Sequence, residues 1–310
     1  MSVKPNETQK TSVHTETNNM PAQDYVQWFR QASPYINAHR GKTFVLMLPG
    51  AAMLHSNFHN IIHDIALLNS LGVRLVLVHG ARPQIDARLA EQNLTSEFHQ
   101  QWRVTDHQHV GAVSQAIGAV RFSLEAALSS SLPNSPMHGA DLRVVSGNYV
   151  TGQPIGVIDG TDLQHTGRVR RVNAQAIHQA LDNLSIVSLS PLGYSPTGEI
   201  FNLCYAELAT QVAIALKADK LIAFTSENGF CGKDGQLQRQ MSLNECKQQL
   251  QKLSLNNEHS QSLQACFDVC QQVVPRAQIV SYQHDGALVK ELFTRDGSGT
   301  LVHRDNYESV

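Results

Sequence analysis

Short uninterrupted apolar runs recur along the chain and alternate with segments in which apolar residues return every three or four positions. The runs at 44–48 and 73–78 each end at a glycine-containing turn. Such runs are typical of strands buried on both faces. The segments at 58–71 and 81–92 have the spacing of helices. This alternation predicts an α/β fold with an open, mainly parallel sheet sandwiched by helices.

The same alternation continues toward the C-terminus. We expect further helices at 108–131, 174–181, 203–217, 262–273 and 286–293, and further strands at 141–150, 153–162, 185–189, 220–225, 278–281 and 300–302. The strands at 141–150 and 153–162 are expected to pair, with Gly147-Asn148 and Gly160 as turn signals. Residues 227–262 are rich in Gln, Asn, Ser and Glu, and we interpret them as a surface excursion that contains a helix. Because we find no internal repeat and no obvious linker, we expect one domain over residues 41–305.

The first forty residues have a different character. Residues 1–23 are polar and rich in Thr, Asn, Gln and Ser, which predicts a disordered tail without the apolar core of a signal peptide. Residues 24–40 are predicted to form an N-terminal helix on which Trp28 and Phe29 follow helical spacing. We expect Pro34 and the pair Gly41-Lys42 to mark its end.

Charge and cysteine content narrow the class of protein. The net charge of −2 argues against a dedicated nucleic-acid binder, which would be basic. The basic cluster Arg168, Arg170 and Arg171 is short and suits a solvated strand face or a subunit contact. Five cysteines fit neither an extracellular disulfide framework nor a complete zinc site. No apolar run is long enough to span a membrane. We therefore expect a cytoplasmic protein with reduced thiols, no metal, no nucleic-acid partner and no membrane partner.

Ligands of open parallel sheets bind beyond the carboxyl ends of the strands. That rule selects the loops at 49–52, 79–84, 190–202 and 225–229. Backbone N–H groups in the first two loops can cradle an anion at a helix N-terminus. Glycines there can equally be simple turn residues, and spacing alone leaves the two readings open.

At these loops the sequence resembles a known family. The second loop reads Val78-His-Gly-Ala-Arg-Pro-Gln84, and further similar stretches are Pro34–Asn37, Arg103–Asp106, Val144–Asn148, His165–Gly167, Ser281–Gln283 and Glu291–Phe293. The pattern resembles the kinase-like domain of bacterial two-domain N-acetylglutamate synthases, a branch of the amino acid kinase family, from about residue 24 to about residue 305. The resemblance implies an amino acid kinase (carbamate kinase-like) fold. It also implies a family activity, the acetylation of L-glutamate by acetyl-CoA at the first step of arginine biosynthesis.

Several departures from the kinase pattern predict that this domain is not a kinase. By the resemblance, Met47 replaces a phosphate-binding lysine, Pro49 replaces a loop glycine, and Ala206 replaces an aspartate that organises the catalytic lysines. A thioether and a methyl group cannot neutralise phosphoryl charge. We regard the kinase loops as vestigial; their residues are Met47, Pro49, Gly50, Gly80, Ala81, Arg82, Asn202 and Ala206. Arg82 and Arg88 can pair a carboxylate there or lie on the surface.

The family's acetyltransferase domain is not expected in these residues. Its coenzyme A loop has a nearest match at 294–299, where Thr294 takes the lead position and only eleven residues follow the loop. We therefore name no catalytic residue and no cofactor in this chain, and acetyl-CoA is expected only as a substrate of the full-length family. The chain is expected to be a truncated piece, a fragment or half of a split enzyme.

The resemblance also implies a binding site for feedback arginine. The matching positions are Tyr35, Lys220, Glu291, Gly297 and Ser298. A carboxylate such as Glu291 suits a guanidinium, and backbone N–H groups at 297–299 can bind the α-carboxylate of arginine. Lys220 can alternatively be a solvated lysine at the start of a strand.

Arginine-sensitive relatives use the N-terminal helix to build hexamers from dimers, so L-arginine and further copies of the chain are the expected partners. Trp28 and Phe29 are candidates for that contact, or else pack on their own domain. Two other functions stay open: an active acetylglutamate or amino-acid kinase, and a non-catalytic partner of a separate acetyltransferase.

Overall fold

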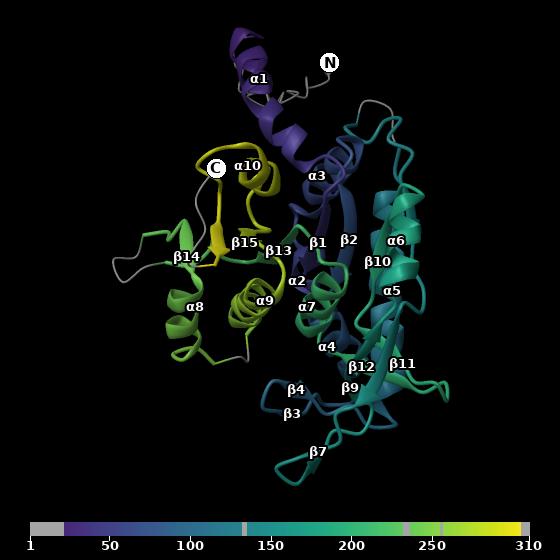
Figure 1. Ribbon diagram of the computed structural model, residues 1–310. Coiled ribbons are helices and arrows are strands. Elements are labelled where there is room, and N and C mark those ends of the chain that lie inside the picture. Colours follow the sequence, from purple (N-terminus) through teal and green to yellow (C-terminus); the bar gives the residue numbers. More distant parts are fainter. Residues whose placement is uncertain (1–21, 132–134, 232–235, 255–256, 305–310) are drawn as a thin grey trace, which may run out of the picture.

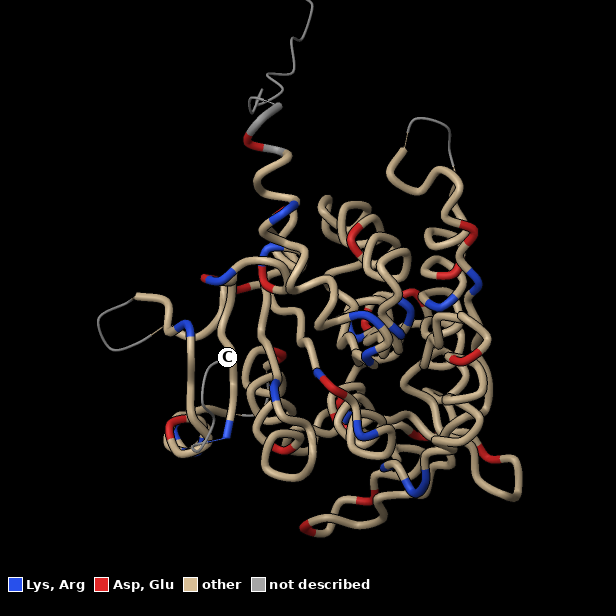
Figure 2. The backbone as a smooth tube through the Cα atoms, turned by 45° about the horizontal axis from the view of Figure 1, so that its top comes forward, with Lys and Arg blue, Asp and Glu red and all other residues tan. Residues whose placement is uncertain are grey.

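The structure, a computed structural model, describes residues 22–131, 135–231, 236–254 and 257–304. Most of the predicted tail at 1–23, namely residues 1–21, lies outside the described residues. Among the described helices, none is both long enough and apolar enough to cross a membrane. Charged residues of both signs are scattered over the described chain, without a long segment of one sign (Figure 2).

The central layer is an eight-stranded, mainly parallel sheet (Figure 1). Its strands, in order across the sheet, are β14 (Gln240–Ser242), β16 (Thr300–His303), β15 (Arg276–Ser281), β13 (Lys220–Thr225), β1 (Thr43–Leu48), β2 (Arg74–His79), β10 (Ser185–Leu189) and β5 (Arg143–Val145). The pairs from β15 to β5 are parallel, and β16 runs antiparallel to β15. The predicted fold class is confirmed.

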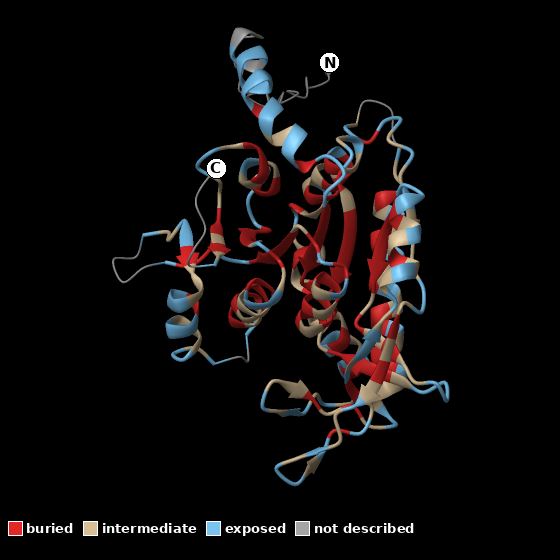
Figure 3. Cartoon of the chain, viewed as in Figure 1, coloured by how far each residue is buried: buried red, intermediate tan, exposed pale blue. Residues whose placement is uncertain are grey.

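Helices cover both faces of the sheet because its central strands carry apolar residues on both faces. In β1, Val45 and Met47 face one core, while Phe44, Leu46 and Leu48 face the other. The first core is completed by α6 (Ala174–Asp182), α7 (Tyr205–Ala215), α8 (Leu243–Leu250) and α9 (Glu258–Gln272). The second is completed by α1 (Ala22–His39), α3 (Phe58–Ser70), α5 (His109–Leu128) and α10 (Ala287–Phe293). Figure 3 shows the buried sheet between helices that also carry exposed residues.

A second, smaller sheet extends beyond the carboxyl ends of β2 and β10. It consists of β6 (Val150–Pro154), β9 (Thr166–Val172), β11 (Leu192–Tyr194) and β12 (Ile200–Leu203). Two hairpins accompany it, β3 (Phe98–His99) with β4 (Trp102–Arg103), and β7 (Val157–Ile158) with β8 (Thr161–Asp162). Two short helices, α2 (Gly50–Leu54) and α4 (Arg82–Glu91), follow β1 and β2.

The predicted pairing of strands 141–150 and 153–162 is wrong. Residues 143–145 pair with β10 in the main sheet, and residues 150–154 pair with β9 in the small sheet. The Gly160 turn closes only the short β7–β8 hairpin. Gly152 explains the arrangement, because a Cβ at this position would lie 3.1 Å from Gly193 Cα, so β6 approaches β11 closely.

Pro34 does not end the N-terminal helix, which continues to His39. Proline removes one N–H and leaves the carbonyl four residues earlier without its helical partner. Here that earlier residue is Arg30, and both Arg30 and Pro34 are exposed, so water can solvate the carbonyl. The excursion at 227–262 contains not only a helix, α8, but also β14, which joins the edge of the main sheet.

Candidate functional site

The two predicted phosphate loops lie at the carboxyl ends of β1 and β2 and pack directly against each other. The Gly80 N–H donates to the Leu48 carbonyl at 2.7 Å, and the Gln84 side-chain amide donates to the Gly50 carbonyl at 2.8 Å. A Cβ on Gly50 would lie 2.4 Å from the Gln84 side-chain oxygen and 2.9 Å from Ala81 Cα. Glycine is therefore required at Gly50 by the contact between the two loops, whether or not an anion binds.

The positions at which the resemblance to the kinases led us to expect a lost charge are apolar and buried. Met47 is 0% exposed and Ala206 is 5% exposed, and both belong to one hydrophobic cluster. Pro49 is buried as well and precedes the first residue of α2. A group that must bind a triphosphate has to be charged and accessible. These three residues are neither.

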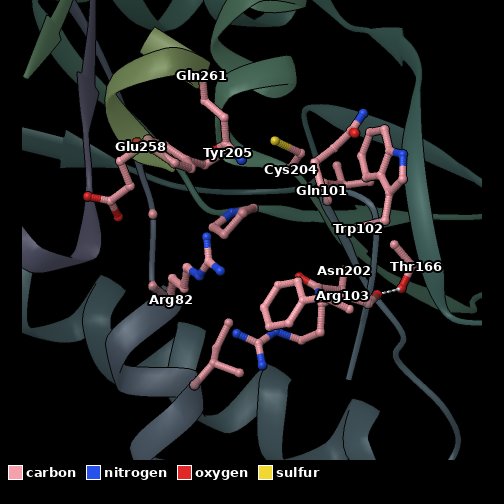
Figure 4. A pocket seen from close by; sticks show the side chains of 16 residues that line it. Arg82, Gln101, Trp102, Arg103, Thr166, Asn202, Cys204, Tyr205, Glu258 and Gln261 are labelled. Atoms are coloured by element: carbon pink, nitrogen blue, oxygen red, sulfur yellow. Dashed lines mark hydrogen bonds between the residues drawn. The ribbon is translucent and has the colours of Figure 1, made fainter. Parts of the chain in front are cut away.

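A cavity of ≈ 90 Å³ remains at this edge, bounded by the β3–β4 hairpin and the start of α9 (Figure 4). The guanidinium carbons of Arg82 and Arg103 lie 4.6 and 4.7 Å from the centre of the Phe98 ring. Arg103 also pairs with Asp86 at 2.8 Å. Asn202 lines the cavity too, but its amide already donates to the Thr105 hydroxyl at 3.1 Å.

Two groups in this cavity were not identified from the sequence. Burial raises the pKa of Glu258, with Arg82 opposing the shift. The hydroxyl of Tyr205 is buried without a hydrogen-bond partner among the described residues. Glu258 lies in a polar stretch that resembles an ordinary surface helix, so its sequence carries no signal. Arg88 is on the surface, paired with Glu91 at 2.8 Å.

The predicted arginine-site lysine is buried, so the alternative of a solvated lysine is wrong. Lys220 is 7% exposed and begins β13 in register with Arg276 of β15. Its ammonium lies 5.8 Å from the centre of the Phe44 ring. Burial, together with the positive charge of Arg276, lowers the pKa of Lys220 to about 8, and Glu291 partly opposes this. A buried ammonium is costly unless something pairs with it.

Glu291, on α10, is held by the turn that follows this helix. Its Oε2 accepts hydrogen bonds from the N–H of Ser298 at 2.6 Å and of Gly299 at 2.8 Å. Gly297 has a φ of +64°, and a Cβ there would lie 2.6 Å from Glu291 Oε2, so both conformation and space favour glycine. The expectation that these N–H groups bind an α-carboxylate does not fit this structure, because Glu291 already occupies them.

α1 is joined to α10 by a histidine that the sequence reasoning missed. His39 Nε2 donates to the Leu292 carbonyl at 2.9 Å, and its ring packs edge-on against Phe44 and Phe293. Burial and the nearby Lys220 charge lower the pKa of His39 to about 4, so the ring is neutral at pH 7. Tyr35, one turn earlier, is half-buried against the same core.

The predicted arginine-site residues thus come from α1, β13, α10 and the turn after α10. Glu291, Gly297 and Ser298 are in direct contact, and Lys220 is coupled electrostatically to Glu291. Lys220 and Arg276 begin their strands, whereas the kinase loops follow the carboxyl ends of β1 and β2. Within the described part of the chain, no three potential metal ligands gather, and all five cysteines are free.

Sequence comparison places this architecture among known proteins. The model of the amino acid kinase family matches residues 42–281. The amino-acid acetyltransferases of Azotobacter vinelandii (strain DJ) and Ectopseudomonas mendocina (strain ymp) are 54% and 53% identical over 287 residues. Each alignment covers 93% of this chain and 66% of the relative, so the chain spans slightly under two thirds of their length.

Solved structures of related proteins have the same fold as this chain. N-acetylglutamate synthase from Neisseria gonorrhoeae, complexed with coenzyme A and L-arginine, superposes with a TM-score of 0.84 at 36% identity, covering 91% of this chain and 66% of that one. Carbamate kinase from Giardia lamblia bound to AMP-PNP shares the fold, with a TM-score of 0.64 at 15% identity over 86% of this chain and 99% of that one. The match from the start of β1 to the end of β15 shows that the chain belongs to the amino acid kinase family.

Proposed function

We propose that this chain is the arginine-sensing, kinase-like part of an N-acetylglutamate synthase and has no kinase activity. The observation that carries the proposal is the buried Lys220 ammonium, which lies in the electrostatic field of Glu291 near the α1–α10 contact. The Neisseria gonorrhoeae relative bound to L-arginine supports it. In the full-length protein the reaction would convert acetyl-CoA and L-glutamate to N-acetyl-L-glutamate and CoA, and the acetyl transfer would occur outside these residues.

Arginine carries a guanidinium that suits the Glu291 carboxylate and an α-carboxylate that suits the Lys220 ammonium. The turn holds Glu291 Oε2 with two N–H groups, which orients the carboxylate. The guanidinium would bind to Oε1 of the same carboxylate in a charge-assisted pair. Lys220 would bind the α-carboxylate, which would neutralise its buried charge. Tyr35 would close the site from α1. Lys220 is thus the proposed partner of the α-carboxylate, whereas the sequence had led us to expect the N–H groups at 297–299 in that role.

The proposed absence of kinase activity is supported by the residues at the carboxyl ends of β1 and β2. The two loops that would surround a triphosphate bind each other, and Met47 and Ala206 lie in the apolar core. Met47 and Ala206 supply no cation of the kind that phosphoryl transfer needs. An active kinase is therefore the weaker candidate.

We also propose that the chain self-associates through α1. This helix projects from the body of the molecule (Figure 1) and carries Trp28 and Phe29 with 41% and 61% of their surfaces exposed. Exposed aromatic residues that cluster on one helix are typical of protein interfaces. A cytoplasmic location, the remaining part of the proposal, suits five cysteines that form no disulfide.

Isothermal calorimetry with three ligands tests the proposal. L-arginine should bind with a saturable heat, whereas ATP with Mg²⁺ and acetyl-CoA should give only dilution heats. D-arginine and L-lysine serve as controls, because they preserve the charges but change the stereochemistry or replace the guanidinium. Saturable ATP binding together with phosphorylation of acetylglutamate would contradict the proposal and restore the kinase alternative.

A further inference from the structure

Two histidines lie one helical turn apart on α3, outside both sites described above. His59 and His63 are separated by four positions, so their side chains project from the same face of the helix. Another face of α3 is fixed in the core by Ile61, Ile62 and Ile65. The two imidazoles are therefore held side by side on a helix that is already ordered, with His59 exposed and His63 half-buried.

The distance between the two rings suits a shared metal ion. The ring centres are 5.9 Å apart, and the ring planes are nearly perpendicular, at 85°. A zinc ion lies about 2.1 Å from a ligating nitrogen and hence about 3.2 Å from the centre of that ring. Two rings that share one ion can thus have centres up to roughly 6.4 Å apart. The observed separation lies within this limit, so small rotations of the side chains can bring one nitrogen of each ring to the same ion.

A hydrogen bond fixes which nitrogen His59 offers to a ligand. Its Nδ1 lies 2.8 Å from the Ser56 carbonyl, which can only accept, so Nδ1 carries the proton and Nε2 keeps its lone pair. Metal-ligating histidines typically donate their other N–H to a carbonyl or carboxylate in this way. His55, four positions earlier, is not equivalent, because its Nδ1 already accepts from the Asn57 N–H at 3.2 Å and its ring packs against Tyr282.

A carboxylate stands beside the two histidines. Asp285 directly precedes Gly286, the N-cap of α10, and α10 packs against α3 (Figure 1). Burial and, after it, the Asp285 carboxylate raise the pKa of Asp64 on α3. Burial and His59 lower the pKa of His63, and Asp285 opposes this shift. The charge of Asp285 therefore reaches α3, where it favours a cation and offsets the partial positive charge at the N-terminal end of the helix.

We propose that His59 and His63 bind one divalent transition-metal ion of the zinc type, with water in the remaining coordination positions. Imidazole nitrogens suit Zn²⁺, whereas Mg²⁺ and Ca²⁺ prefer oxygen ligands. In the described part of the chain no third His, Cys, Asp or Glu joins the pair as a ligand, so Asp285 acts through its charge. The proposal departs from the absence of metal expected from the sequence. It does not depend on the arginine proposal, since none of these residues belongs to that site.

Calorimetric titration of the metal-free full chain with zinc chloride tests this site. The unaltered chain should show a saturable component of one ion per chain. That component should be lost, or weakened by at least about tenfold to a hundredfold, in His59→Gln and in His63→Gln, since even the loss of an outer partner of a metal ligand has an effect of that size. Magnesium chloride at the same ionic strength should produce only dilution heat.

His138→Gln is the matched control, because it removes an exposed histidine that lies on neither α3 nor α10. This variant should retain the zinc component in full. Asp285→Asn should weaken the component without abolishing it, since a nearby charge is lost while both ligands remain. A crystal soaked in zinc chloride should show an anomalous peak at the zinc edge between the rings of His59 and His63.

Two results would overturn the proposal. One is zinc binding that is absent from the unaltered chain or is the same in that chain, His59→Gln and His63→Gln, because other histidines or cysteines would then hold any ion that binds. The other is a zinc-soaked crystal without an anomalous peak between the two rings. Both histidines lie outside the hydrophobic clusters, so the two variants are expected to fold, and an unchanged melting temperature without metal would verify this.

Discussion

At the residue scale, the sequence indicated apolar residues at the expected kinase positions but not how the charged residues are arranged. Met47 and Ala206 could be identified as apolar replacements because the change of residue type is itself the signal. The burial of Lys220 and the engagement of the 297–299 turn by Glu291 could not be predicted, since both depend on contacts between segments far apart in the chain. His39 and Glu258 were missed for the same reason.

Glu291→Gln should weaken arginine binding by roughly tenfold to a hundredfold, the cost of losing one hydrogen bond to a charged partner. The fold should persist, because the amide oxygen of Gln can still accept from the N–H groups of Ser298 and Gly299. Calorimetry measures the affinity. Glu91→Gln, an exposed change of equal charge on α4, should leave it unchanged. Equal losses in both variants would show that Glu291 has no specific role.

Arginine affinity should also fall as the pH rises through about 8. Burial lowers the pKa of Lys220 to about 8, so its ammonium is present below that pH and lost above it. An α-carboxylate binds the ammonium and not the neutral amine, which gives the sign of the effect. Calorimetry between pH 6.5 and 8.5 measures it. Lys220→Met should bind more weakly and lack this step; a step of the same size in that variant would come from arginine's own amino group.

At the element scale, helices and central strands were predictable because their periodicity is local, whereas pairing in the small sheet was not. The strand at 150–154 lies between β9 and β11, where Gly152 permits close approach to Gly193 of β11, and no local pattern encodes contacts over such a sequence distance. The continuation of α1 through Pro34 has a similar origin. Its last turn is fixed by the bond from His39 to Leu292, so tertiary contact outweighs the local preference of proline.

The double substitution Trp28→Ala with Phe29→Ala should reduce self-association without unfolding the chain. Both side chains are exposed on α1 and contribute little to the core. Sedimentation equilibrium or light scattering should detect a smaller assembly, while the melting temperature of the dissociated chain should be unaffected. Leu54→Ala is a suitable control, because it removes another exposed apolar side chain from a different element. An unchanged assembly in the double variant would exclude α1 as the contact.

At the scale of the whole molecule, the chain has the fold of the amino acid kinase family, and we propose that it no longer acts on phosphate. The fold class was predictable because an alternation of buried strands and amphipathic helices permits few architectures. The proposed function depends on two regions. In one, the loops after β1 and β2 bind each other; in the other, the α1–α10 contact lies beside the buried Lys220. Because His39 connects α1 to the carbonyl of Leu292, the residue after Glu291, we propose that a ligand on Glu291 would alter the angle of α1.

The most direct test is a crystal structure of the chain grown with saturating L-arginine, ATP and Mg²⁺ together. The account predicts arginine density that bridges the Glu291 carboxylate and the Lys220 ammonium, and no nucleotide over the loops at Gly50 and Gly80. An ordered triphosphate with magnesium over those loops, with no arginine beside Glu291, would contradict it.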